Sequence, residues 1–109
     1  MATAAYWQRG ESLDYVNETD DVIEAGTVID LSTRIGVAGC DIEAGATGSL
    51  HVIGVFEIAK TTATEEIAMG ADVYFDGTGI TATSGSTPAG YAAVASTADD
   101  ETVYVKLLG

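Results

Sequence analysis

Short apolar stretches alternate with polar turns along the whole chain, and this spacing predicts β-strands. The longest stretch spans residues 51–60 and is apolar on both faces. Its side chains alternate between those faces, with Val52, Phe56 and Ile58 on one and Ile53 and Val55 on the other. Because a strand that is apolar on both faces must be covered on both, we expect this one at the centre of the fold. One face should pack on the core, and the other should be covered by a second sheet or by another subunit.

Other segments with strand character flank this stretch, and they are separated by turns rich in Gly, Asp, Ser and Thr. They span residues 13–16, 27–31, 34–38, 72–76, 80–83, 91–95 and 101–108. Residues 61–69 are expected to form at most one short helical turn, since Glu65 and Glu66 near its start would suit the helix dipole. The fold class predicted is therefore all-β: a small β-barrel or β-sandwich with short hairpins, in a single domain over residues 1–109.

One turn unit, Ile-x-x-Gly, occurs three times in the chain. The copies run from Ile23 to Gly26, from Ile42 to Gly45 and from Ile67 to Gly70. In each copy the Ile is expected to enter the core and the Gly to take a conformation that other residues resist. Because the spacing is uneven, we interpret the unit as recurrent turn chemistry and not as a solenoid repeat.

The charge balance excludes whole classes of partner. The 109 residues include 17 Asp and Glu against four Lys and Arg, which gives a net charge of −13. A nucleic-acid-binding protein neutralises phosphates with basic side chains, so we expect no nucleic-acid partner, and acidic membrane surfaces are disfavoured for the same reason. The opening residues lack the basic start and apolar segment of a signal peptide. Cys40 has no second cysteine to pair with and is expected to be a small core residue.

Candidate catalytic chemistry is sparse. No phosphate-binding loop is present, because no Lys follows a Gly, and Gly77-x-Gly79 lacks the third glycine of a dinucleotide site. His51 is the single histidine, and no local pattern supplies it with a nucleophile, so it is expected to face solvent or to be hydrogen-bonded. The acidic pairs at 20–21 and 99–101 are expected to be solvated turns and not calcium ligands. We therefore expect no enzyme activity, no cofactor and no metal; a hydrolase is the least implausible enzymatic alternative.

Several sequence elements, in order, resemble a family of small tailed-phage proteins known as capsid decoration or cement proteins. They are Gly10-Glu11-x-Leu13-Asp14-Tyr15, Gly54-Val55-Phe56-Glu57-Ile58-x-Lys60, Ile67-x-x-Gly70-x-Asp72-Val73-Tyr74-Phe75-Asp76 and Val103-x-Val105-Lys106-Leu107. The family has also been labelled a predicted phage recombinase. That activity would need a strand-loop-helix ATP site and a basic DNA path, and this sequence has neither.

The resemblance implies a structural phage head protein that binds the outer surface of the capsid and stabilises it. Its partner would be the major capsid protein, and it would form a homo-oligomer, with a trimer favoured over a dimer. Its location would be the exterior of the virion, and the host cytoplasm during assembly. The alternative is a small β binding module that recognises a glycan or a peptide on the host surface, through Tyr6, Trp7 or Tyr91.

Candidate contact residues follow from the enrichment of aromatic side chains and Arg at interface anchors. Residues 1–10 form a candidate N-terminal docking arm, in which Tyr6, Trp7 and Arg9 are the candidate capsid contacts. An aromatic pair near a terminus can instead pack into its own core; for Trp7 we favour this interpretation, and Tyr6 is left open between the two. The candidate subunit-interface residues are Ile53, Val55, Tyr91 and Val94.

Overall fold

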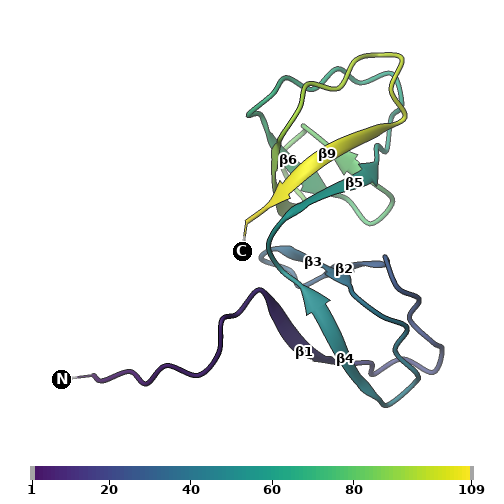
Figure 1. Ribbon diagram of the computed structural model, residues 1–109. Helices are drawn as coiled ribbons and strands as arrows, with labels where there is room; N and C mark the ends of the chain where they lie inside the picture. The colour runs from purple at the N-terminus through teal and green to yellow at the C-terminus, as the bar shows by residue number, and fades with distance from the viewer. Residues whose placement is uncertain (1, 109) are drawn as a thin grey trace.

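The computed structural model describes residues 2–108, which form nine strands in two antiparallel sheets (Figure 1). The strands are β1 (Ser12–Val16), β2 (Val28–Asp30), β3 (Ile35–Ala38), β4 (Thr47–His51), β5 (Val55–Ala59), β6 (Asp72–Phe75), β7 (Ile80–Thr81), β8 (Thr87–Ala92) and β9 (Thr102–Leu107). None of the described residues is helical, and neither sheet closes into a barrel. The prediction of a small all-β fold is confirmed.

The two sheets are built on the same plan. The first has the strand order β1-β4-β3-β2 and the second the order β5-β9-β8-β6, with β7 added at its end. We call residues 11–52 the N-terminal half and residues 54–107 the C-terminal half. In Figure 1 the N-terminal half lies below the C-terminal half. Equivalent backbone bonds tie the turns of each half to its sheet. The amide of Gly26 donates to the Ala38 carbonyl at 2.7 Å, as that of Gly70 does to the Ala92 carbonyl at 2.7 Å.

The Ile-x-x-Gly units are turns of this repeated plan. Their glycines have φ values of +89° at Gly26, +77° at Gly45 and +85° at Gly70, a left-handed conformation that favours glycine. Ile23 forms an antiparallel bridge with Ile42, and Ile67 forms the equivalent bridge with Ser96. The prediction of recurrent turn chemistry is confirmed. A fourth turn begins at Ser96 without the motif, and β7 with the loop after it makes the C-terminal half longer than the N-terminal half.

The main core lies between the two sheets and inside the C-terminal half. The alternation of β9 places Val103, Val105 and Leu107 inward, where they are at most 2 % exposed. Ile35 and Val37 of β3 join the same apolar cluster and so link the first sheet to the second. Full burial of such side chains stabilises the fold by about 1.5–3 kcal/mol each. A smaller cluster fills the N-terminal half and consists of Ile29, Leu50 and Val52, with Tyr15, Ile23 and Leu31 packed against it.

The stretch from 51 to 60 is not the single central strand that its pattern predicts. β4 ends at His51 and β5 begins at Val55, and the residues between them carry the chain from one sheet to the other. Gly54 makes the bend with a φ of +116°. Ile53 and Val55 remain 42 % and 53 % exposed, so the chain's own second sheet does not cover them. Their coverage by another subunit stays a prediction.

Residues 61–69 form a loop and a bridge without a helical turn, which agrees with the expectation of at most one. Two further expectations are wrong. The strand expected over 91–95 begins earlier and ends at Ala92, because it pairs with both β6 and β9. Cys40 is exposed, since it lies in the turn after β3 and not within a strand.

Candidate interaction surfaces

Residues 2–10 form an extended arm that precedes β1 and leaves the body of the protein (Figure 1). Tyr6 is 84 % exposed and Trp7 is 81 % exposed, so packing of Trp7 into the protein's own core is wrong. Arg9 is exposed too, and its guanidinium lies 3.7 Å from the carboxylate of Glu11. An ion pair this exposed contributes little to stability and leaves the cation free to meet a partner.

A second surface is the outer face of the C-terminal sheet. Val55 on β5, Lys106 on β9 and Tyr91 on β8 are neighbours in register and form one row across three strands. The Lys106 ammonium lies 5.8 Å from the centre of the Tyr91 ring, a cation–π arrangement that holds the two side chains together. Tyr91 is 41 % exposed and Tyr104, in the next row, is 46 % exposed. This part of the row therefore presents two apolar side chains beside one basic group, and the exposed Asp72 of β6 follows Tyr91 in the same row.

The structure places two of the four side chains predicted for a subunit interface in one row. Val55 and Tyr91 share the row just described, and Val94, 55 % exposed, lines a shallow cleft together with Tyr104 and Glu57. Ile53 lies outside the strands, in the link between β4 and β5. Sequence reasoning missed Tyr104, although the pattern held the signal: Tyr104 stands between the two inward-facing residues Val103 and Val105 and must therefore point outward.

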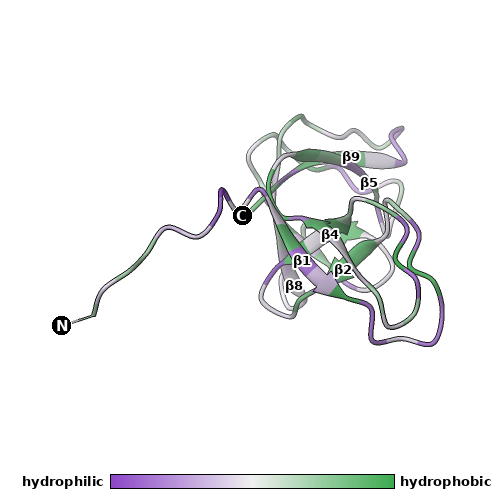
Figure 2. Cartoon of the chain, turned by 60° about the horizontal axis from the view of Figure 1, so that its bottom comes forward, coloured by the Kyte–Doolittle hydropathy of each residue, from purple (hydrophilic) through white to green (hydrophobic). Residues whose placement is uncertain are grey.

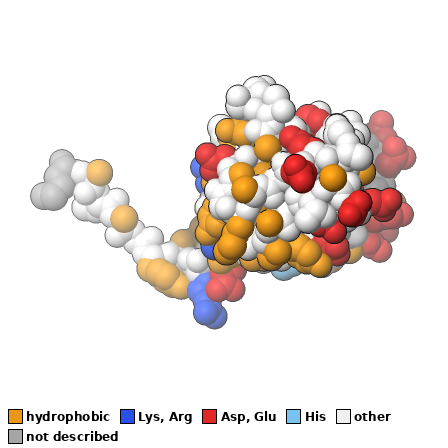
Figure 3. Space-filling model, turned by 90° about the horizontal axis from the view of Figure 1, so that it is seen from above, with side chains coloured by type: hydrophobic (Ala, Val, Ile, Leu, Met, Phe, Trp, Pro, Cys, Tyr) orange, Lys and Arg blue, Asp and Glu red, His pale blue; other side chains and the backbone are white. Residues whose placement is uncertain are grey.

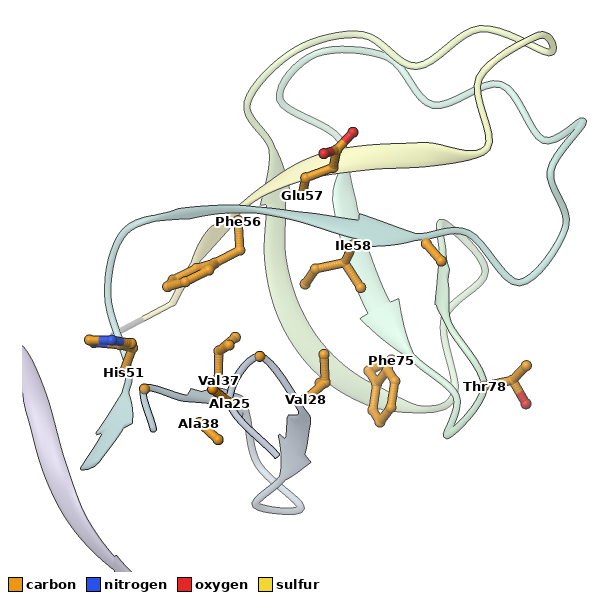
Figure 4. A pocket seen from close by; sticks show the side chains of 13 residues that line it. Ala25, Val28, Val37, Ala38, His51, Phe56, Glu57, Ile58, Phe75 and Thr78 are labelled. Atoms are coloured by element: carbon orange, nitrogen blue, oxygen red, sulfur yellow. The ribbon is translucent and has the colours of Figure 1, made fainter. Parts of the chain in front are cut away.

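A groove of about 640 Å³ separates the two sheets and is lined mainly by apolar side chains. Val28 and Val37 of the first sheet face Phe56, Ile58 and Phe75 of the C-terminal half across it, whereas the carboxylate of Glu57 points away (Figure 4). These five side chains belong to or pack against the main core cluster. The groove is thus the junction at which the two halves meet, and it lacks the convergent polar groups of a catalytic pocket.

His51 lies at one end of this groove and is half-buried. Its Nδ1 is hydrogen-bonded to the Ser12 hydroxyl at 3.1 Å, and its ring lies 5.9 Å from the Phe56 ring at a tilt of 32°. The expectation that this histidine is hydrogen-bonded is confirmed. Among the described residues, no group of three or more His, Cys, Asp or Glu side chains could hold a metal ion.

Two carboxylates have lowered pKa values, and both cap turns. The backbone amide of Gly79, the hydroxyl of Thr61 and the amide of Thr78 all donate to Asp76, which lowers its pKa. The amide and hydroxyl of Thr97 lower the pKa of Asp100 in the same way. Hydrogen bonds to the charged form have this effect, whereas a catalytic acid needs a raised pKa. Both carboxylates are therefore turn elements, as predicted for the acidic cluster at 99–101.

Charge is distributed unevenly over the surface. Acidic side chains gather on one side of the body, and hydrophobic side chains gather on the side nearer the arm (Figure 3). In the cartoon coloured by hydropathy, green hydrophobic stretches lie on strands such as β4 and β9, and the loops alternate between hydrophilic and hydrophobic stretches (Figure 2). Within residues 2–108 there is no helix long and apolar enough to cross a membrane.

The fold and these surfaces define a class: a small all-β protein whose exposed features suit contact with other protein surfaces. Comparison with known families makes the class specific. The family model for phage cement proteins matches residues 7–107 of the 109, and the chain belongs to that family. The family gives it a structural role associated with the phage capsid. No curated protein and no solved structure matches the chain.

Proposed function

We propose that this protein binds the outer surface of the assembled phage capsid and stabilises the shell. The observation that carries the proposal is the arm: a member of the cement protein family presents Tyr6 and Trp7 almost fully to solvent, away from its own core. Large exposed aromatic side chains are costly unless a partner covers them, and they are the usual anchors of protein interfaces. The major capsid protein is the partner that fits this role.

The mechanism is binding linked to the closed lattice. A protein that binds the assembled shell and not its dissociated subunits stabilises the assembly by mass action. Each copy would bridge neighbouring shell subunits through the arm, with Tyr6 and Trp7 as apolar anchors and Arg9 as the cation among them. An extended arm can also add a strand to an exposed sheet edge on the shell. The protein would be present in the host cytoplasm during assembly and on the exterior of the finished virion.

Oligomerisation would strengthen this binding. We propose a homotrimer in which the outer face of the C-terminal sheet, with Val55, Tyr91 and Val94, and the adjoining Ile53 form the subunit interface. Several arms on one oligomer act together, with gains of about 10²–10⁴ in effective affinity. The single β domain of each copy would then serve as the rigid body that carries the arm.

Sedimentation with undecorated shells tests the proposal. The intact protein is expected to co-sediment at micromolar concentration. Trp7→Ala is expected to weaken binding at least about tenfold, as for an interface anchor, while the folded body is unchanged. Met69→Ala is the matched control, because Met69 is a large apolar residue that is 73 % exposed and lies outside the arm. Absence of the intact protein from the shell pellet would overturn the proposal.

A further inference from the structure

The junction between the two halves has two mating surfaces. The first is a row across the N-terminal sheet: Val28 pairs with Val37, Val37 with His51, and His51 with Ser12. The second consists of Phe56, Ile58 and Phe75 of the C-terminal half, which face that row across the groove (Figure 4). Contact between them reduces the exposure of Val37 to 5 %.

The first surface recurs in the C-terminal half, but uncovered. There the row consists of Asp72, Tyr91, Lys106 and Val55, each paired with the next. In that order, these four residues stand where Val28, Val37, His51 and Ser12 stand in the N-terminal half. Tyr91, which stands where Val37 stands, is 41 % exposed. We call this row the acceptor face.

The second surface recurs in the N-terminal half, also without a cover. Leu13 pairs with Leu50 as Phe56 pairs with Val105, and Tyr15 stands in β1 where Ile58 stands in β5. Leu13 is 39 % exposed, and Tyr15 is half-buried. We call these β1 side chains, with Leu31 beside them, the donor face.

We propose that a second copy of this chain docks its donor face on the acceptor face, and so repeats between molecules the junction that joins the two halves within one molecule. The charges are complementary at one point: the acceptor face carries the cation Lys106, with Asp72 at the far end of its row, and Glu11 lies two residues before Leu13 at the edge of the donor face. At the corresponding positions within the chain the groups are His51 and Gly54, so this attraction is specific to the contact between molecules.

The contact is head-to-tail, because it joins two different surfaces; such a contact closes a ring when its rotation returns to the first copy and otherwise extends into a filament, and the proposed trimer requires closure. A ring of three copies would contain six halves joined by alternating junctions within and between chains. The arm leaves the body before β1, so Tyr6 and Trp7 remain available to the shell. The inference rests on the proposed subunit interface and supplies its missing half, the surface that meets Tyr91 and Val55.

Complementation between two defective variants tests this arrangement. Leu13→Glu damages only the donor face and Tyr91→Glu only the acceptor face, so each alone is expected to be monomeric by light scattering at about 50 µM, where the unaltered protein is trimeric. An equimolar mixture is expected to form a dimer, because each variant retains the surface that the other has lost. A contact between identical surfaces could not be restored by mixing. Met69→Glu, at a residue that is 73 % exposed, is the control and should stay trimeric.

A charge exchange keeps the test decisive if either glutamate variant fails to fold. Lys106→Glu is expected to raise the dissociation constant of the oligomer at least about tenfold, and Glu11→Lys in the same chain is expected to restore most of the loss. A monomeric unaltered protein, a mixture that stays monomeric, or no rescue by Glu11→Lys would overturn the inference. A monomer that still co-sediments with shells would overturn only this interface, whereas a trimer that fails to co-sediment would overturn only the shell binding.

Discussion

Two buried polar side chains, Asn17 and Lys60, occupy the same place in the two halves. The Asn17 side-chain amide donates to the carbonyls of Asp21 and Ile42, both at 2.8 Å. The Lys60 ammonium donates to those of Glu65 at 2.7 Å and Thr97 at 2.9 Å. Each side chain therefore joins two loops of its own half of the chain. Neither role was visible in the sequence, because the carbonyls that are bonded lie up to 37 residues away.

Removal of the Lys60 ammonium should therefore destabilise the fold. Lys60 is only 7 % exposed, so Lys60→Met would keep the apolar stem but remove the donor to the Glu65 carbonyl and one of two donors to the Thr97 carbonyl, which also accepts from the Asp100 amide. We expect a loss of about 2–4 kcal/mol in the free energy of unfolding, measured by urea denaturation. Arg9→Met removes one positive charge from the exposed arm and should change that free energy by less than about 0.5 kcal/mol. Equal effects of the two substitutions would show that charge, and not the hydrogen bonds, is responsible.

At the scale of elements, strands with a clear period were predictable and their ends were not. The alternation of Val103, Val105 and Leu107 correctly predicted an inward face, because burial on one side leaves a period of two. The residues from His51 to Val55 are predicted to continue one strand. A link between two sheets has apolar side chains on both sides of it, as a central strand does. Pattern alone cannot separate those cases, and the break depends on the φ of Gly54.

Gly90 in β8 gives a test of how closely the C-terminal strands approach. Its φ is +144°, and a Cβ at this position would overlap the carbonyl oxygen of Lys106 on β9. Because backbone cannot move aside as a side chain can, Gly90→Ala is expected to cost about 3 kcal/mol or more in the free energy of unfolding.

Gly45→Ala is the matched control for this substitution. Gly45 has a φ of +77°, but a Cβ there would have no heavy atom within 4 Å, so the change should cost only about 1–2 kcal/mol. Thermal unfolding of both variants measures the difference. If Gly90→Ala proves no more costly than Gly45→Ala, the close approach of β8 to β9 is wrong.

At the scale of the whole molecule, the family was predictable and the architecture was only partly so. Short motifs in a fixed order were enough to identify the cement protein family, because each marks a turn or strand of the fold. The division into two sheets of equivalent plan was not predicted. It depends on which strands pair, and pairing joins residues far apart in the chain. Because the two halves are equivalent, the candidate interface on β5, β8 and β9 corresponds to the surface of the N-terminal half that already packs in the junction within the chain.

Location on the shell is the central claim at this scale, and electron cryomicroscopy of decorated shells tests it most directly. Undecorated shells would be incubated with the protein and compared with shells alone and with shells given a chain that lacks residues 2–10. We predict added density on the outer surface where shell subunits meet, with the arm in contact with the shell, and little added density for the shortened chain. Added density confined to the inner surface, or none with the intact protein, would contradict the account.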